Sequence, residues 1–196
     1  MSMAAFSPSE EGDDKMSYSL DAFCEDCRTA LKVDPGPGGR EAVRQNLERL
    51  LAEPAFLDEH VLSAPAGRHT LYEDPQLGFV VLAHINPKGH KSPPHDHGAS
   101  WAVYGQATQY TDMTEWRRTD GKEDPGPASI EVVRQYRLEP GHAGTYDIRA
   151  IHNIEFPDGA RFVRVTGTDL ERIPRLKFDL GKGIAEVIES ASAGAA

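Results

Sequence analysis

Cysteine is scarce in this sequence. Only two cysteines occur among 196 residues, as the pair Cys24 and Cys27 in FCEDC. A zinc site built on such a pair needs two more ligands, and the sequence contains no second C-x-x-C. The cysteines instead share helical spacing with Leu20, Phe23 and Leu31. This spacing predicts two small apolar side chains buried on one face of a helix.

Long apolar runs are also missing. No stretch approaches the roughly 18 consecutive apolar residues that a membrane-spanning helix requires. Residues 1–15 are rich in Ser, Glu and Asp and lack the apolar centre of a secretory signal. We therefore expect a soluble, cytoplasmic protein that has no membrane partner.

Basic clusters are absent as well. The formal net charge is −10, and Arg117 and Arg118 form an isolated pair rather than a patch. An acidic chain of this kind is a poor ligand for nucleic acid or for an anionic membrane surface. The partners that we expect are small molecules. With 39% hydrophobic residues, the chain has enough apolar material for one domain with some added elements.

The N-terminal third is predicted to be helical after a disordered start. Residues 1–16 have the composition of a disordered segment. Residues 17–63 contain two helical patterns, separated by the turn-forming cluster DPGPGG at residues 34–39. The second pattern runs from Arg40 to about Leu51, and further apolar positions follow Pro54. Its apolar face consists of Val43, Leu47, Leu50 and Leu51.

Residues 64–182 have a different character. Short β-rich runs alternate there with turn signals such as NPKG, EPG and PDG. Regular spacing of this kind predicts an all-β sandwich or barrel, and no intervening helical pattern supports a parallel α/β sheet. In the tail, residues 183–196, we expect a short helix followed by a frayed end. The expected strands are residues 78–85, 100–110, 129–138, 144–148, 150–156, 160–167 and 175–180.

Chemistry is concentrated in PPHDHGASW, residues 93–101. In an extended chain, side chains at i and i+2 share a face, so His95 and His97 project together while Asp96 points the other way. Two imidazoles aimed at one point form half of a metal site, and neutral nitrogen ligands suit Fe, Zn, Ni or Cu. A third ligand must come from elsewhere. His152 is the best candidate, because it lies within the β-run IHNIEF.

Two segments carry a family resemblance. GHKSPPHDHGASW (89–101) and EPGHAGTYDIRAIH (139–152) resemble the two-part metal signature of the cupins. More narrowly, HDHGASWAVYG resembles the metal motif of cysteine dioxygenase and its thiol dioxygenase relatives. The resemblance spans roughly residues 68–180. It implies a mainly β fold, the cupin double-stranded β-helix or jelly-roll barrel, with the N-terminal helices as a cover.

The same resemblance implies the ligands and the metal. It assigns Fe(II) to His95, His97 and His152, with Ni, Zn or Mn as alternatives. It also leaves a homodimer open, since cupins often pair. The other histidines are expected to be structural or exposed: His142 lies in a turn, His90 lies in a loop, and His84 alternates with apolar neighbours.

Several positions depart from the family pattern. Many cupins carry a ligand Glu shortly after the second histidine, where this chain has Trp101 and Ala102; thiol dioxygenases also lack that Glu. Ala102 likewise replaces the cross-linking Cys of the animal enzymes. Arg164 and Thr166 stand where many thiol dioxygenases have His-x-Tyr. Arg68 is a candidate for the arginine that anchors the substrate early in the domain.

Two further residues are predicted to act beside the metal. Phe162, Arg164 and Thr166 share a strand face that the resemblance places inside the barrel, where a guanidinium needs an anion. We therefore predict that Arg164 binds an acidic substrate; the alternative is an outward-facing arginine. Tyr104 follows Ala102 by two positions and is predicted to be catalytic, donating a hydrogen bond in the cavity. The alternative is a core aromatic with a satisfied hydroxyl.

The expected function is that of a mononuclear non-haem iron(II) dioxygenase of thiol dioxygenase type, an enzyme that oxidises a small anionic substrate with O2. Two alternatives remain open. One is a cupin dioxygenase that cleaves carbon–carbon bonds of a diketone-like substrate. The other is a non-catalytic cupin that binds a metal or ligand. No role is predicted for the strand-like block from Tyr110 to Arg118.

Overall fold

The computed structural model describes residues 17–190, so the disorder expected for residues 1–16 and the last residues of the tail lie outside the described residues. The helical segment begins at Ser19, whose hydroxyl accepts a hydrogen bond from the Ala22 N–H and caps the first helix. The second helix has proline in its first turn, where the missing N–H removes no bond. The helical elements are α1 (Leu20–Val33), α2 (Pro37–Leu51), α3 (Pro54–Leu57) and the π turn η1 (Asp58–Leu62).

The rest of the described chain is almost entirely strand and turn. A single 3-10 turn, η2 (Leu170–Arg172), interrupts it. The strands are β1 (Gly67–Glu73), β2 (Val80–Ile85), β3 (His90–Lys91), β4 (Ala102–Thr108), β5 (Thr111–Arg118), β6 (Gly126–Pro127), β7 (Ile130–Leu138), β8 (Ala143–Tyr146), β9 (Ile151–Phe156), β10 (Arg161–Thr166), β11 (Arg175–Asp179) and β12 (Ile184–Ile188).

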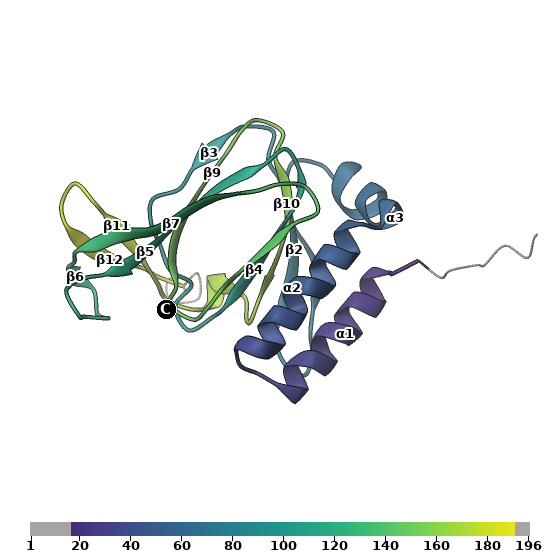
Figure 1. Cartoon of the computed structure of the whole chain (residues 1–196), viewed down its shortest axis with the longest axis horizontal. Helices are drawn as coiled ribbons and strands as arrows, with labels where there is room; N and C mark the ends of the chain where they lie inside the picture. The colour runs from purple at the N-terminus through teal and green to yellow at the C-terminus, as the bar shows by residue number, and fades with distance from the viewer. Residues whose placement is uncertain (1–16, 191–196) are drawn as a thin grey trace, which may run out of the picture.

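Two antiparallel sheets face each other and form the barrel (Figure 1). One has the order β2-β10-β4-β8, with β1 added at the outer edge of β2, and the other has the order β3-β9-β5-β7. This alternation of strands between two sheets is the jelly-roll arrangement found in cupins. The expected mainly β, double-stranded β-helix fold is therefore confirmed. A small sheet of β11, β12 and β6 projects from one end of the barrel.

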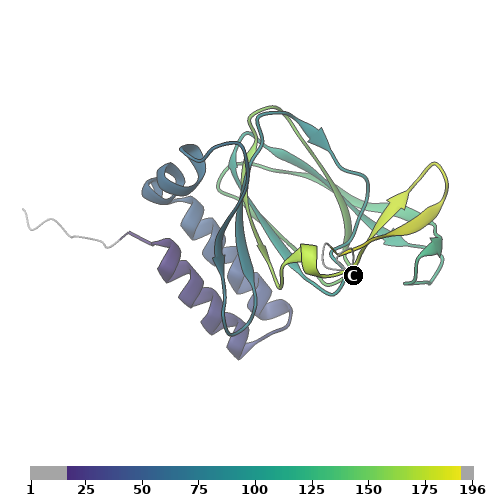
Figure 2. The ribbon, with the colours of Figure 1, turned by 180° about the vertical axis from the view of Figure 1, so that it is seen from behind.

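The helices cover the outer face of the sheet that contains β2, β10 and β4 (Figure 2). The predicted apolar face of α2 is buried there, with Leu47 and Leu50 fully inaccessible. The close approach depends on Gly105 in β4, since a Cβ at that position would lie 2.7 Å from a methyl carbon of Leu47. In α1, both cysteines are buried as predicted, and neither forms a disulfide.

Strand β10 separates the two parts of the core. Val163 and Val165 belong to the cluster under the helices, whereas Phe162 belongs to the cluster inside the barrel. Side chains alternate across a strand, so Arg164 shares the inner face with Phe162. The orientation predicted for Arg164 therefore holds in the structure.

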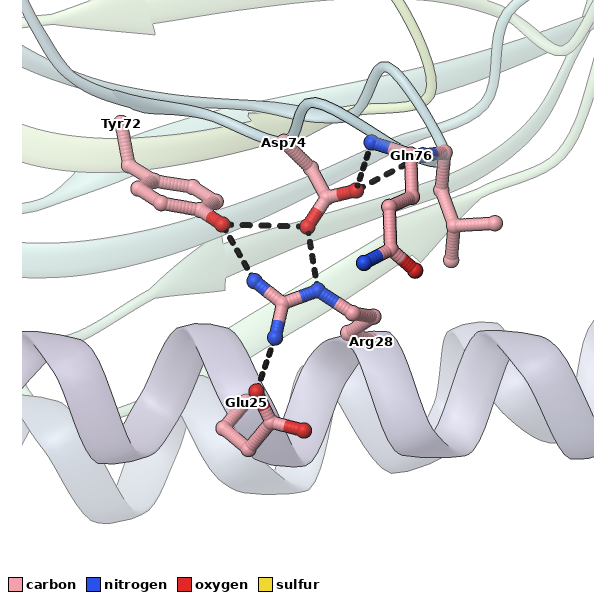
Figure 3. A network of polar contacts seen from close by, with 6 residues as sticks. Glu25, Arg28, Tyr72, Asp74 and Gln76 are labelled. Atoms are coloured by element: carbon pink, nitrogen blue, oxygen red, sulfur yellow. Dashed lines mark hydrogen bonds and ion pairs between the residues drawn. The ribbon is translucent and has the colours of Figure 1, made fainter.

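A polar network ties the helices to the sheet (Figure 3). Asp74, at the end of β1, has a fully buried side chain and accepts hydrogen bonds from the Nε of Arg28 in α1 at 2.8 Å and from the Tyr72 hydroxyl at 3.1 Å. The backbone N–H groups of Gln76 and Leu77 donate to its other oxygen. Burial alone would raise the pKa of Asp74. The hydrogen bonds to its carboxylate have the larger combined effect and hold the pKa below its usual range.

One expectation about secondary structure was wrong, and one strand was missed. The tail after Gly183 was expected to be helical, but residues 184–188 form β12, which pairs with β11 from Ile184 opposite Asp179 to Ile188 opposite Arg175. The β-branched residues at 184, 187 and 188 favour this hairpin, and Gly183 supplies the positive φ that its turn requires. Strand β1, which pairs with β2, was not predicted.

Candidate metal centre

The segment that carries the first two histidines is an extended loop between β3 and β4 rather than a continuous strand. Pro93 and Pro94 lack the N–H groups that a ladder needs. Regular pairing resumes only at His95, which exchanges two backbone hydrogen bonds of 2.9 Å with His152 in β9. This isolated bridge brings residues of the two sequence motifs into direct contact.

The three predicted ligands converge inside the barrel. One nitrogen from each of His95, His97 and His152 lies within 4.8 Å of the others. His97 and His152 are 1% and 0% exposed, and their Nε2 atoms are 3.1 Å apart. His95 is only partly buried, which leaves the cluster accessible from its side. Within residues 17–190, this is the group of metal-ligating side chains that the structure assembles.

The imidazoles are held neutral. Burial lowers the pKa of His97 and His152 well below the usual range, and the neighbouring imidazoles and the charge of Arg164 lower it further. The pKa of His95 is also lowered, chiefly by burial. His95 Nδ1 lies 3.0 Å from the Pro93 carbonyl oxygen, so this nitrogen donates and Nε2 keeps a free lone pair. Neutral imidazoles with free lone pairs are the form that binds metal ions.

The spacing of two of the three donors fits a metal ion. Two nitrogens that are each about 2.1 Å from one ion, and at right angles, lie about 3 Å apart. The separation of 3.1 Å between the Nε2 atoms of His97 and His152 matches this value.

Asp96 locks the loop in place. Its Oδ1 accepts hydrogen bonds from the Gly98 N–H at 2.9 Å and from the Leu176 N–H at 2.8 Å, and its own N–H donates to the Leu176 carbonyl. The side chain is turned away from the histidines, as predicted, but it is buried rather than solvated. It therefore fixes the backbone between His95 and His97 against β11.

Tyr104 lies directly beside the cluster. It projects from β4 into the inner core, is 3% exposed, and its hydroxyl is 3.3 Å from His97 Nε2. Its ring also contacts that of His152, with centroids 5.4 Å apart. The structure thus places the predicted catalytic tyrosine within hydrogen-bonding distance of a predicted ligand, and its catalytic role stays a prediction.

A second tyrosine pair was not predicted. The Tyr146 ring packs on that of His152 with centroids 4.4 Å apart, and its hydroxyl is 2.5 Å from that of Tyr136. Tyr136 in turn donates to Glu115, which also pairs with Arg134 at the surface. The block Tyr110–Arg118, for which the sequence predicted no role, thus contributes Glu115 to a hydrogen-bonded chain that reaches the ring beside His152.

Two arginines were candidates for anion binding, and the structure gives them different surroundings. The Cζ of Arg164 lies 5.8 Å from the centroid of the Tyr104 ring, inside the barrel. Arg68 pairs instead with Glu171, and both side chains are more than 40% exposed. Arg68 therefore already has a carboxylate partner at the surface.

Arg175 is a further cation near the cluster that the sequence did not single out. It begins β11, and its charge contributes to lowering the pKa of His95 and His97. The sequence showed only that Arg175 lies in the last predicted strand. No local sequence pattern indicates that this strand packs beside the histidines.

The remaining histidines are exposed or structural, as predicted, although His90 lies in a short strand and not in a loop. His142 and His90 are exposed, in a turn and in the short strand β3. His84 stacks on Phe162 with ring centroids 4.6 Å apart, and burial lowers its pKa well below the usual range.

A cavity of about 520 Å³ lies beside the histidines rather than at them. It is lined by Pro93 and Pro94, which precede His95, and by Asn153, which follows His152. Side chains alternate across β9, so this cavity is on the face opposite to the His152 ring.

The helices that the structure describes include no segment with the length and apolar character of a membrane span.

No family model and no curated protein matches the chain. Among solved structures, the chain is similar to the cupin domain of Cnp3 from Schizosaccharomyces pombe, with 11% identity and a TM-score of 0.41, over 55% of this chain and 66% of that one. It is also similar to an oxalate oxidase in complex with glycolate, with 16% identity and a TM-score of 0.38, over 54% and 53%. A third is peruvianin-I, a cysteine peptidase from Thevetia peruviana latex, with 14% identity and a TM-score of 0.36, over 47% and 52%. The chain thus spans between half and two thirds of each of these proteins.

Proposed function

We propose that this protein is a mononuclear non-haem iron(II) dioxygenase of thiol dioxygenase type that oxidises a small anionic substrate with O2. The observation that carries the proposal is the convergence of His95, His97 and His152 without a carboxylate in the group. Three neutral ligands leave the full charge of a divalent ion uncompensated, which favours anionic ligands in the remaining positions.

The iron would be held by the three imidazoles and would supply the redox centre at which substrate and O2 meet. The chain positions these groups in advance. The bridge between His95 and His152 aligns the two motifs, and the hydrogen bond from His95 to Pro93 fixes the ring that is partly exposed. Phe162 and Ile154 belong to the buried apolar cluster inside the barrel, and this cluster excludes water from the part of the barrel that it fills.

Arg164 is suited to hold the substrate's acidic group. It lies on the inner face beside Tyr104, and among residues 17–190 no carboxylate pairs with it. A guanidinium can bind a carboxylate through two parallel hydrogen bonds and so fix the orientation of the substrate. The Tyr104 hydroxyl, 3.3 Å from His97 Nε2, is placed to donate a hydrogen bond to a group bound beside the ligands.

A second candidate function is the cleavage of carbon–carbon bonds in a diketone-like substrate. It is favoured by one specific feature, namely that Arg164 and Thr166 stand where thiol dioxygenases have His-x-Tyr. Thr166 is fully buried, and its hydroxyl has no partner among the described residues. A third alternative, a cupin that binds a metal or ligand without catalysis, predicts no oxygen consumption at all.

An oxygen-electrode assay distinguishes these functions. Iron-loaded protein is mixed with cysteine, 3-mercaptopropionate or a diketone such as acetylacetone. Oxygen uptake with the thiols supports the proposal, and uptake with the diketone alone supports the second function. No uptake with any of them, at full iron occupancy, contradicts both enzymatic assignments.

Arg164→Ala tests the anchoring role. We expect KM to rise while iron content stays unchanged, because the guanidinium contacts the substrate and not the ligands. Arg117→Ala is the matched control, since Arg117 is exposed and pairs with Glu131 on the outer surface. Equal KM values in the two variants would remove Arg164 from the site.

A further inference from the structure

Two arginines differ from all the others that the structure describes. Within residues 17–190, every arginine except Arg161, Arg164 and Arg175 has an ion pair with a carboxylate. Arg161 donates instead to the carbonyl oxygens of Val61 and Leu62. Arg164 and Arg175 have neither kind of partner, and the Nε of each is buried without a hydrogen bond.

Both unpaired arginines lie around the histidine cluster. Arg164 reaches it through Tyr104, whose hydroxyl is 3.3 Å from His97 Nε2. Arg175 comes from a different element, β11, which the Asp96 carboxylate binds at the next residue, Leu176. A Cβ built on Gly98, one residue after His97, would lie 3.7 Å from the Cγ of Arg175. Arg175 therefore lies beside the loop that carries the ligands, and Arg164 lies beside the Tyr104 ring that contacts them.

The charges of the two arginines act on each other. Burial lowers the pKa of Arg175, and the positive charge of Arg164 lowers it further. Both charges also lower the pKa of His95 and His97. Two partly desolvated guanidinium groups that repel each other are unfavourable unless an anion compensates them. One carboxylate can be shared by two guanidinium groups, but two carboxylates give each of the two forks its own pair of parallel hydrogen bonds.

We propose that Arg164 and Arg175 form a binding site for two acidic groups beside the histidine cluster, so that its ligand is a small dicarboxylate. Taking this ligand as the substrate rests on the proposed function; the binding site itself does not. The substrate is then a molecule with two separated carboxylates and not simply any small anion. Arg164 holds the carboxylate nearer Tyr104, and Arg175 holds the one nearer the partly exposed side of His95.

Calorimetric titration with succinate and with butanoate tests this inference. The two acids have the same chain length and differ in the second carboxylate. They are titrated into metal-loaded protein in low-salt buffer without a thiol. We expect succinate to bind at least about tenfold more tightly than butanoate, since charge-assisted hydrogen bonds of a second fork add to the first.

Single-arginine variants assign the effect. Arg175→Gln should remove the advantage of succinate while leaving butanoate affinity within about twofold, and Arg164→Gln should weaken both acids. Arg175→Lys, which keeps the charge but not the fork, should retain part of the advantage. Arg172→Gln is the control, because Arg172 is exposed and pairs with Glu73. Unchanged circular dichroism and metal content establish that each variant is folded.

Three results would overturn the inference: equal affinities for the two acids, no binding of either, or a preference for succinate that survives in Arg175→Gln. Its failure is separate from that of the proposed function. If oxygen uptake does not depend on a second carboxylate in the thiol substrate, only the identification of the substrate as a dicarboxylate is overturned. Tight succinate binding without oxygen uptake from any substrate overturns only the dioxygenase.

Discussion

Replacing Asp96 with alanine should damage both the fold and the candidate metal centre. A single oxygen of this buried carboxylate, Oδ1, accepts hydrogen bonds from the N–H groups of Gly98 and Leu176. Each donor that loses its partner costs about 1–3 kcal/mol, and the lower end applies because both backbones are only partly buried. We expect Asp96→Ala to lower the free energy of unfolding by about 2–4 kcal/mol.

The matched variant is Asp96→Asn. An asparagine keeps an oxygen at the position of Oδ1, so both donors retain their acceptor. Its free energy of unfolding should therefore stay within about 1 kcal/mol of that of the unsubstituted protein. Urea unfolding of metal-free protein measures both variants.

The same pair of variants tests the link to the site. Contacts that orient metal ligands typically contribute about 10–100-fold to metal affinity. Asp96→Ala should lose metal affinity in that range, and Asp96→Asn should lose much less. Two results would refute the reasoning: an Asn variant as destabilised as the Ala variant, which would make the charge decisive, or an Ala variant with unchanged metal affinity.

Two further variants test the core and the pH response. Leu47→Ala should lower the free energy of unfolding, measured in urea, by about 3 kcal/mol, because this residue of α2 is fully buried against Gly105 of β4. Leu62→Ala, at an exposed position, should be nearly neutral and serves as the control. Burial first, and then the charges of Arg164 and Arg68, keep the pKa of His84 in the folded state well below its unfolded value. Only the unfolded chain therefore gains this proton as pH falls below about 6.5, and stability falls with pH by up to about 1.4 kcal/mol per unit. His84→Gln should reduce this slope in metal-free protein, and an unchanged slope between pH 6.5 and 5 would contradict the assignment.

Much of the architecture could be predicted because its signals are local. The apolar face of α2 and the alternation of the barrel strands are periodic patterns within single elements, and both match the structure. The histidine pair was recognisable for the same reason, since His95 and His97 share a face whenever the chain is extended. The β-run around His152 made it the best candidate for a third ligand, but only the family resemblance paired it with the two histidines, because no local rule connects it to a loop 55 residues away.

The residues that the sequence missed depend on contacts between distant segments. The bond from Leu176 to Asp96 joins positions 80 residues apart, and it is this pairing that brings Arg175 to the ligand loop. The tail was misassigned for a related reason. A short segment of mixed propensity becomes a strand only when β11 offers an edge to pair with, and tertiary pairing of this kind overrides a weak local preference.

Iron binding by single histidine variants tests the central claim most directly. Purified protein and the variants His95→Gln, His97→Gln and His152→Gln are saturated with ferrous salt without oxygen, dialysed and measured by elemental analysis. His142→Gln, in an exposed turn, is the control. One iron per chain in the unsubstituted protein and in the control, and almost none in the three folded variants, is the expected result. Full iron content in any of the three, or none in the unsubstituted protein, would contradict a metal centre built from these histidines.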